Sequence, residues 1–110
     1  MESLALPETT EEPHFEKTSF RVKGKIFATY DSMNHMACIK LSELDQNVFT
    51  KISGGSIFPV PNKWGLNGWT NIDLNTVDKN IFRDALITAY CTVAPKKLAL
   101  QVRPDTPESL

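Results

Sequence analysis

Trp64 and Trp69 are the two tryptophans of the chain, in the stretch NKWGLNGWTNIDL, and each stands beside a glycine. Lys63 directly precedes the first of them. Aromatic rings next to a cation can stack on nucleic-acid bases, because every base has a π-face and the phosphates attract the ammonium group. The same residues can also form a turn with an aromatic anchor. The pattern therefore leaves a ligand-binding surface and a structural turn both open.

Basic side chains form a second candidate site on either side of Gly24. If Phe20 and Val22 point into a core, the two-residue period of a strand turns Arg21 and Lys23 outward. Cations in such places contact phosphates in many proteins, but they also protect edge strands against aggregation, and both explanations stay open. The candidate nucleic-acid-binding residues that follow from these patterns are Arg21, Lys23, Lys25, Lys63 and Trp64.

The charges are distributed unevenly although the net charge is only −1. Residues 1–16 contain five Glu and no Lys or Arg, whereas residues 17–63 contain seven Lys or Arg and three Asp or Glu. Residues 64–110 contain five charges of each sign. Because a dedicated nucleic-acid-binding domain is usually far more basic, this distribution favours at most weak binding of double-stranded DNA.

Residues with catalytic or metal-binding chemistry are sparse. Cys38 and Cys91 lie in apolar stretches, where a thiol usually packs as a small hydrophobe. The segment EEPHFE gathers His14 among carboxylates but has the composition of a solvated acidic loop, and the sequence contains no nucleophile-elbow or phosphate-loop motif. We therefore predict a non-enzymatic protein with no catalytic residues, no metal site and no cofactor.

The organisation of the chain points to one domain over residues 1–100 and a flexible tail over residues 101–110. No apolar run reaches the length of a membrane-spanning helix. The acidic start lacks the features of a signal peptide. We expect a cytoplasmic protein with free thiols and no membrane partner.

Alternating hydrophobicity predicts strands in the first half of the chain. Residues 18–30 form a hairpin that turns at Gly24, and residues 36–40 form a third strand. Two prolines restrict residues 56–64 to an edge or a loop. A further strand over 69–74 is expected to pack Trp69 against the helix layer and to leave Trp64 more exposed.

Two longer helices are predicted from their caps and apolar spacing. Ser42 is the expected N-cap of the first, and its apolar stripe consists of Leu44, Val48 and Ile52, flanked by Phe49. The second follows a cap at Asn75 or Thr76 and ends before Pro95. With MESLALP as the end of a short first helix, the order is α-β-β-β-α-β-β-α. This order indicates an α+β two-layer sandwich, an antiparallel sheet with helices on one face and an open second face.

Four stretches in this order resemble the MmcQ/YjbR-like family of small bacterial proteins: LALPETTEEPHFEKTSFRVKGKIFATYD, ACIKLS, FPVPNKWGLNGWTNIDL and LITAYCTVAPKKLA. The resemblance covers about residues 4–100 and implies the same element order, the CyaY-like fold. It implies less about function: one branch of the family has been proposed to bind DNA by a double-wing arrangement. The matching elements here are the Arg21–Lys25 hairpin and the Asn62–Trp69 loop, and Lys40 near the sheet is a further candidate nucleic-acid-binding residue. The resemblance assigns no catalytic residues.

The chain departs from that family at its start, where only MESLA precedes the LP pair instead of about a full helix. Core surface that such a helix would cover could be covered by a second subunit, so a homodimer is expected. An alternative function is a protein-interaction or regulatory module that uses the open face of the sheet.

Overall fold

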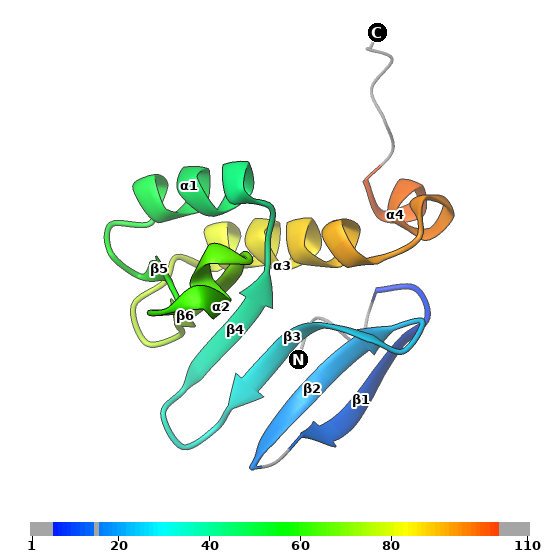
Figure 1. Ribbon diagram of the computed structural model, residues 1–110, viewed down its shortest axis with the longest axis horizontal. Coiled ribbons are helices and arrows are strands. Elements are labelled where there is room, and N and C mark those ends of the chain that lie inside the picture. Colours follow the sequence, from blue (N-terminus) through cyan, green and yellow to red (C-terminus); the bar gives the residue numbers. More distant parts are fainter. Residues whose placement is uncertain (1–5, 15, 104–110) are drawn as a thin grey trace, which may run out of the picture.

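The computed structural model describes residues 6–14 and 16–103 of the chain. Within them, six strands form one antiparallel sheet in the order β1-β2-β3-β4-β6-β5. Four helices accompany the sheet, and the arrangement is the predicted α+β class (Figure 1). The elements are β1 (Thr9–His14), β2 (Lys17–Val22), β3 (Lys25–Asp31), β4 (Met36–Lys40), α1 (Glu43–Ile52), β5 (Ile57–Pro59), α2 (Lys63–Leu66), β6 (Trp69–Asp73), α3 (Lys79–Val93) and α4 (Lys96–Val102).

The β2–β3 hairpin turns where the sequence predicts. Val22 pairs with Lys25, and the two residues between them, Lys23 and Gly24, have φ angles of 52° and 79°. Two consecutive residues in the left-handed region are what a type I′ turn requires, and this turn matches the natural twist of paired strands. The third predicted strand is also present, as β4.

Strand β1 was not expected, because its residues, TTEEPH, read as part of an acidic loop. Glu11 pairs with Phe20 and Glu12 with Ser19 across the β1–β2 ladder. An edge strand needs backbone pairing on one side only, and charged residues are common on such edges. The prediction of a loop here is therefore wrong. The predicted first helix lies mostly in residues 1–5, outside the described residues.

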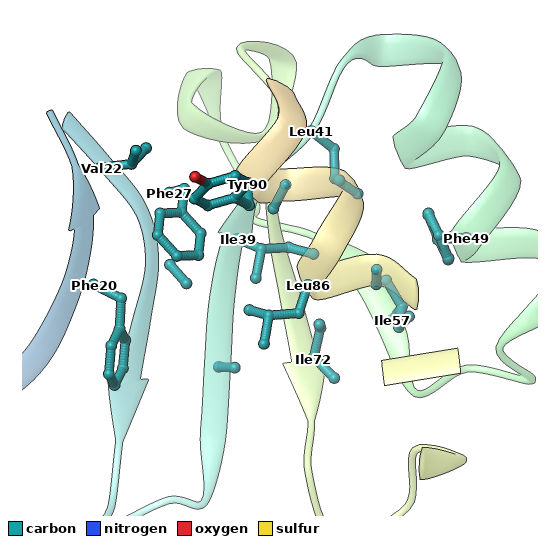
Figure 2. Packing of buried hydrophobic residues seen from close by; sticks show 14 of the residues in the cluster. Phe20, Val22, Phe27, Ile39, Leu41, Phe49, Ile57, Ile72, Leu86 and Tyr90 are labelled. Atoms are coloured by element: carbon teal, nitrogen blue, oxygen red, sulfur yellow. The ribbon is translucent and has the colours of Figure 1, made fainter. Parts of the chain in front are cut away.

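The core lies between the sheet and helix α3. Phe27, Ile39 and Ile72 from the sheet are fully buried, and Leu86 and Tyr90 of α3 pack onto them (Figure 2). The rings of Phe27 and Tyr90 meet edge to face, with centroids 5.4 Å apart. This geometry is favourable because the positive edge of one ring meets the negative face of the other. The Tyr90 hydroxyl donates to the Pro7 carbonyl at 2.6 Å, which ties the start of the described chain to α3.

Helix α1 begins at the predicted cap, since the Ser42 hydroxyl accepts from the Asp45 amide. Its predicted apolar stripe, however, faces away from the core: Leu44, Val48 and Ile52 are 72%, 46% and 54% exposed. The buried side of α1 carries Phe49 and Gln46 instead. A polar residue can occupy that side because its amide finds hydrogen-bond partners in the loop beneath it.

The C-terminal helices differ from the sequence-based boundaries. Asp78 caps α3 by accepting from the amides of Asn80 and Ile81, so neither Asn75 nor Thr76 is the cap. Helix α4 covers KKLALQV, where the sequence predicts a last helical turn or two, and it includes Gln101 and Val102 at the start of the expected tail. The Arg103 guanidinium contacts Asp84 of α3 at 2.6 Å and closes this end of the fold.

Candidate nucleic-acid interface

The open face of the sheet is defined by the register of its inner strands. Cys38 pairs with both Thr29 and Asn71, and Lys40 pairs with Trp69. These residues alternate with buried positions that face the helices, such as Ile39 and its partner Thr70. Trp69 therefore lies on the open face, and the prediction that it packs against the helix layer is wrong. Side chains alternate between the two faces along β6, so Trp69 lies on the same face as the polar Asn71 and Asp73. This alternation is visible in the sequence and indicates the open face for Trp69.

The loop between β5 and β6 holds Trp64 in place through close backbone contacts. The Asn62 side chain accepts from the Trp64 amide at 2.8 Å and starts the short helix α2. A Cβ atom at Gly65 would lie 1.9 Å from the Val60 carbonyl oxygen, and one at Gly68 would lie 1.9 Å from that of Leu41. The glycines beside the tryptophans are therefore sites of tight packing.

Gln46 of α1 supports this loop from below. Its buried side-chain amide donates to the Gly65 carbonyl at 3.0 Å, to the Trp69 carbonyl at 3.3 Å and to the Thr70 hydroxyl at 3.0 Å. Buried polar groups that are satisfied in this way fix the geometry of the segments they join. Gln46 thus sets the position of α2, and with it the position of Trp64, relative to the sheet.

A groove of about 800 Å³ crosses the open face between the two tryptophans and strand β2. Trp64 and Trp69 line it together with Ile26, Val60 and Cys38. The Trp64 side chain is 57% exposed, whereas Trp69 is half-buried, so the predicted order of exposure holds. The groove offers aromatic and aliphatic surface to a ligand, a composition typical of small-ligand and base-binding sites.

Three of the five candidate cations already have partners within the protein. The Arg21 Nε atom donates to the Ser19 hydroxyl at 3.1 Å and lies 3.9 Å from a Glu12 carboxylate oxygen. The Lys23 ammonium lies 2.7 Å from the Glu8 carboxylate. Both ion pairs are partly exposed, and such pairs contribute little stability, so they reduce the free charge of the face without fixing these side chains firmly.

Lys40 is the third engaged cation. Its ammonium donates to the Asn67 carbonyl and lies 5.6 Å from the centroid of the Trp69 ring. A cation over an indole face is a favourable contact. Lys40 therefore links β4 to the loop after α2, and its charge is directed toward the protein.

Lys25 and Lys63 are exposed, and neither side chain has a hydrogen bond or ion pair with any of the described residues. Lys25 starts β3 beside the hairpin turn, and Lys63 starts α2. Because Ala28 pairs with Ile39 and Lys40 with Trp69, the hairpin turn and the α2 loop lie at the same end of the sheet. The two predicted wing elements thus lie at the same end of the sheet, but Lys25 is the cross-strand partner of the buried Val22, so its side chain points to the helix side and not to the open face.

Lys17 also lines the groove, although the sequence gave no reason to choose it over other lysines. Burial raises the pKa of the Cys38 thiol, and the positive charge of Lys17 offsets part of that rise. Lys17 also contributes to the lowered pKa of Asp31, whose main cause is a hydrogen bond from the Asn34 side chain. The Lys17 charge therefore lies close enough to both groups to favour their ionised forms.

Metal-binding and membrane-spanning features are absent from the described part of the chain. No group of three or more His, Cys, Asp or Glu side chains in it is arranged to hold a metal ion. None of its helices has the length and apolar character that crossing a membrane requires. Cys38 and Cys91 are both free thiols.

Together these features define a class of small α+β proteins, in which an antiparallel sheet is covered by helices on one face and carries two loops beside its open face. The family model described as YjbR matches residues 4–92, and the chain belongs to the YjbR family. This confirms the resemblance seen in the sequence. None of the curated proteins matches the chain.

A solved structure shares the fold. The chain is similar to Deinococcus radiodurans protein DR2400, which carries the domain DUF419, with a TM-score of 0.71 and 21% sequence identity. The similarity covers 96% of this chain and 83% of that one. At this identity the likeness describes the architecture and leaves the function to be argued from the site.

Proposed function

We propose that the protein is a non-enzymatic nucleic-acid-binding protein that uses the groove of the open face and the two loops beside it. The observation that carries the proposal is the exposed Trp64 ring, held at the edge of a groove that Trp69 also lines. Base–aromatic stacking contributes about 1–3 kcal/mol per base. Two such rings can therefore supply useful affinity on a face that has little free positive charge.

The groove favours unpaired bases over an intact duplex. Bases inside a duplex are stacked on each other, so their faces are not available to a tryptophan ring, whereas single strands expose them. Phosphate contacts fall to the accessible cations on the side of the groove, Lys17 and Lys63. With about two phosphates neutralised, the slope of log Kobs against log salt is expected to be about −1.4 for a single strand.

A titration of labelled single-stranded and duplex DNA over a range of salt concentrations tests the proposal. We expect tighter binding of the single strand, quenching of tryptophan fluorescence, and a loss of about tenfold in affinity for Trp64→Ala. The double variant Lys17→Gln/Lys63→Gln should remove most of the salt dependence, a change of about 1.4 in the slope. The matched control is Lys96→Gln/Lys97→Gln, which removes two exposed lysines from α4 and should bind like the parent.

Two outcomes would contradict this assignment. Absence of binding at low salt, or binding that does not weaken as salt rises, would rule out phosphate contacts. Equal affinity for duplex and single strand, with no effect of Trp64→Ala, would favour the duplex-binding wing model that one branch of the family suggests.

A second candidate function is binding of another protein chain, and the exposed stripe of α1 favours it. Leu44, Val48 and Ile52 follow one another at four-residue spacing, centred on Val48. Two copies can pair such a stripe about a two-fold axis, so that each apolar residue meets an apolar one. Sedimentation across protein concentrations tests this homodimer. Self-association that survives Val48→Glu, or a monomer at all concentrations, would exclude it.

A further inference from the structure

A second hollow, of about 670 Å³, lies on the helix side of the sheet, beside the start of α3. Helix α3 packs mainly against β3 and β4, so it covers β1 and β2 less. Phe20, Leu74, Val77 and Phe82 line the hollow, and Figure 2 shows Phe20 at the margin of the core cluster. Its walls combine apolar and polar groups, and its volume is typical of a small-molecule site.

Two opposite charges border this hollow, Glu11 from β1 and Lys79 from α3. Glu11 is paired in register with the buried Phe20, which directs both side chains to the same side of the sheet. Neither charged group forms a hydrogen bond or ion pair with any of the described residues, so more than 4.0 Å separates them. Other charges of the same elements are engaged, as the pairs Glu12–Arg21 and Asp84–Arg103 show.

The amides at the start of α3 are not available to a ligand, because the Asp78 carboxylate already accepts from two of them. An anion at this end therefore depends on the Lys79 ammonium. The wall also has a polar position, where the Tyr30 hydroxyl and the His35 Nδ1 atom lie 3.3 Å apart in a hydrogen bond. The hollow thus combines an apolar floor with separate sites for a cation and an anion.

We propose that this hollow binds a small zwitterion with an aromatic or aliphatic body, such as a free amino acid. The body would rest on Leu74, Val77 and Phe82, the ammonium group would face Glu11, and the carboxylate would face Lys79. Charge complementarity at both ends sets the orientation, and burial of the body against the apolar walls supplies most of the affinity. This site is independent of the nucleic-acid interface, which lies on the opposite face of the sheet.

The test is an NMR titration of the full chain with three probes that share one ring: phenylalanine, phenethylamine and 3-phenylpropionate. The shifted amides should surround Phe20, Tyr30 and Phe82. Glu11→Gln should weaken phenylalanine and phenethylamine by about two- to fivefold and leave phenylpropionate unchanged, as expected for an exposed charge pair. Lys79→Gln should weaken phenylalanine and phenylpropionate and leave phenethylamine unchanged.

Both variants replace an exposed charged side chain with an uncharged polar one, so they should fold, and matching amide spectra check this directly. Glu43→Gln and Lys97→Gln, at exposed sites of α1 and α4, are the matched controls and should not change any of the three affinities. Shifts that map to the open face, a lack of saturation by any probe, or equal effects of the two variants on all three probes would each overturn the proposal.

Discussion

The ammonium of Lys40 lies 5.6 Å from the centroid of the Trp69 ring, and the two residues are direct partners across the β4–β6 ladder. The same ammonium donates to the Asn67 carbonyl. A residue that the sequence marks as a candidate for phosphate binding is therefore part of the framework that holds the groove. Substitution of Lys40 should therefore affect stability, whereas substitution of the exposed Lys63 should affect binding.

Lys40→Met keeps an unbranched side chain that is one atom shorter and removes the charge and the hydrogen bond. We expect the free energy of unfolding to fall by about 0.5–2 kcal/mol, because the cation–π contact and the hydrogen bond are lost. Nucleic-acid affinity should change little. Lys63→Met is the matched variant and should show the reverse, weaker binding with unchanged stability. Equal effects of the two variants on affinity would mean that the Lys40 charge also reaches the ligand.

Gly68→Ala should be strongly destabilising. Gly68 has a φ of 100°, and an added Cβ would lie 1.9 Å from the Leu41 carbonyl oxygen, so both strain and overlap oppose the substitution. We expect a loss of about 2–4 kcal/mol in urea unfolding. Gly24→Ala separates the two causes, since Gly24 also has a positive φ but open space around it, and should lose about 1–2 kcal/mol. A similar loss for both variants would contradict the role of close packing.

Gln46→Ala should loosen the loop that carries Trp64. The substitution removes the donor that bridges α1 to Gly65, Trp69 and Thr70, and should reduce stability by about 1–3 kcal/mol. Hydrogen exchange should become faster at the amides of α2. Asn47→Ala, at the exposed neighbouring position, should change stability by less than about 0.5 kcal/mol. Unchanged exchange in α2 would show that Gln46 does not position the loop.

Stability should decline in alkaline solution. Burial raises the pKa of the Cys38 thiol above its ordinary value of 9.0, so the unfolded chain loses this proton at a lower pH than the folded protein. The free energy of unfolding is therefore insensitive to Cys38 below about pH 9 and falls as the pH rises from there toward the folded pKa. Burial raises the pKa values of Cys91 and Tyr90 in the same direction.

Urea unfolding at about pH 8 and about pH 10 measures this decline. Cys38→Ala should lose less stability over the interval than the parent protein, because one of the contributing groups is removed. An identical decline in the two proteins would show that the Cys38 thiol ionises as easily in the folded state as in the unfolded state.

Elements with local signals are predictable from the sequence. The hairpin turn depends on Lys23 and Gly24 alone, because a type I′ turn needs only two adjacent residues that tolerate positive φ. The start of α1 depends on Ser42, whose hydroxyl reaches an amide three residues away. Features such as these need no information about distant parts of the chain, and both were predicted correctly.

The face that an element buries depends on contacts between distant residues. The stripe of Leu44, Val48 and Ile52 satisfied the helical period, yet the structure buries the opposite side, where Gln46 finds partners 19 to 24 residues away. Strand β1 was not predicted for a related reason. Backbone pairing with β2 holds it in the sheet, so its sequence does not need alternating apolar residues.

For the candidate nucleic-acid interface, local sequence identified exposed residues but not the partners of the other cations. Lys25, Lys63 and Trp64 were chosen from local sequence, and the structure leaves all three exposed. The partners of Arg21, Lys23 and Lys40 come from β1 or its preceding turn and from the loop after α2. Sequence spacing contains no information about these pairings, so engaged and free cations could not be told apart before the sheet register was known.

The sheet ends at both sides in a strand that contains a proline, Pro13 in β1 and Pro59 in β5. Proline cannot donate a backbone hydrogen bond, and Glu11 and Glu12 add charge to the β1 edge. Another strand therefore finds no continuous ladder to join at either side. In a concentrated solution, this should let the protein keep a broad sheet face uncovered without copies adding edge to edge into fibres.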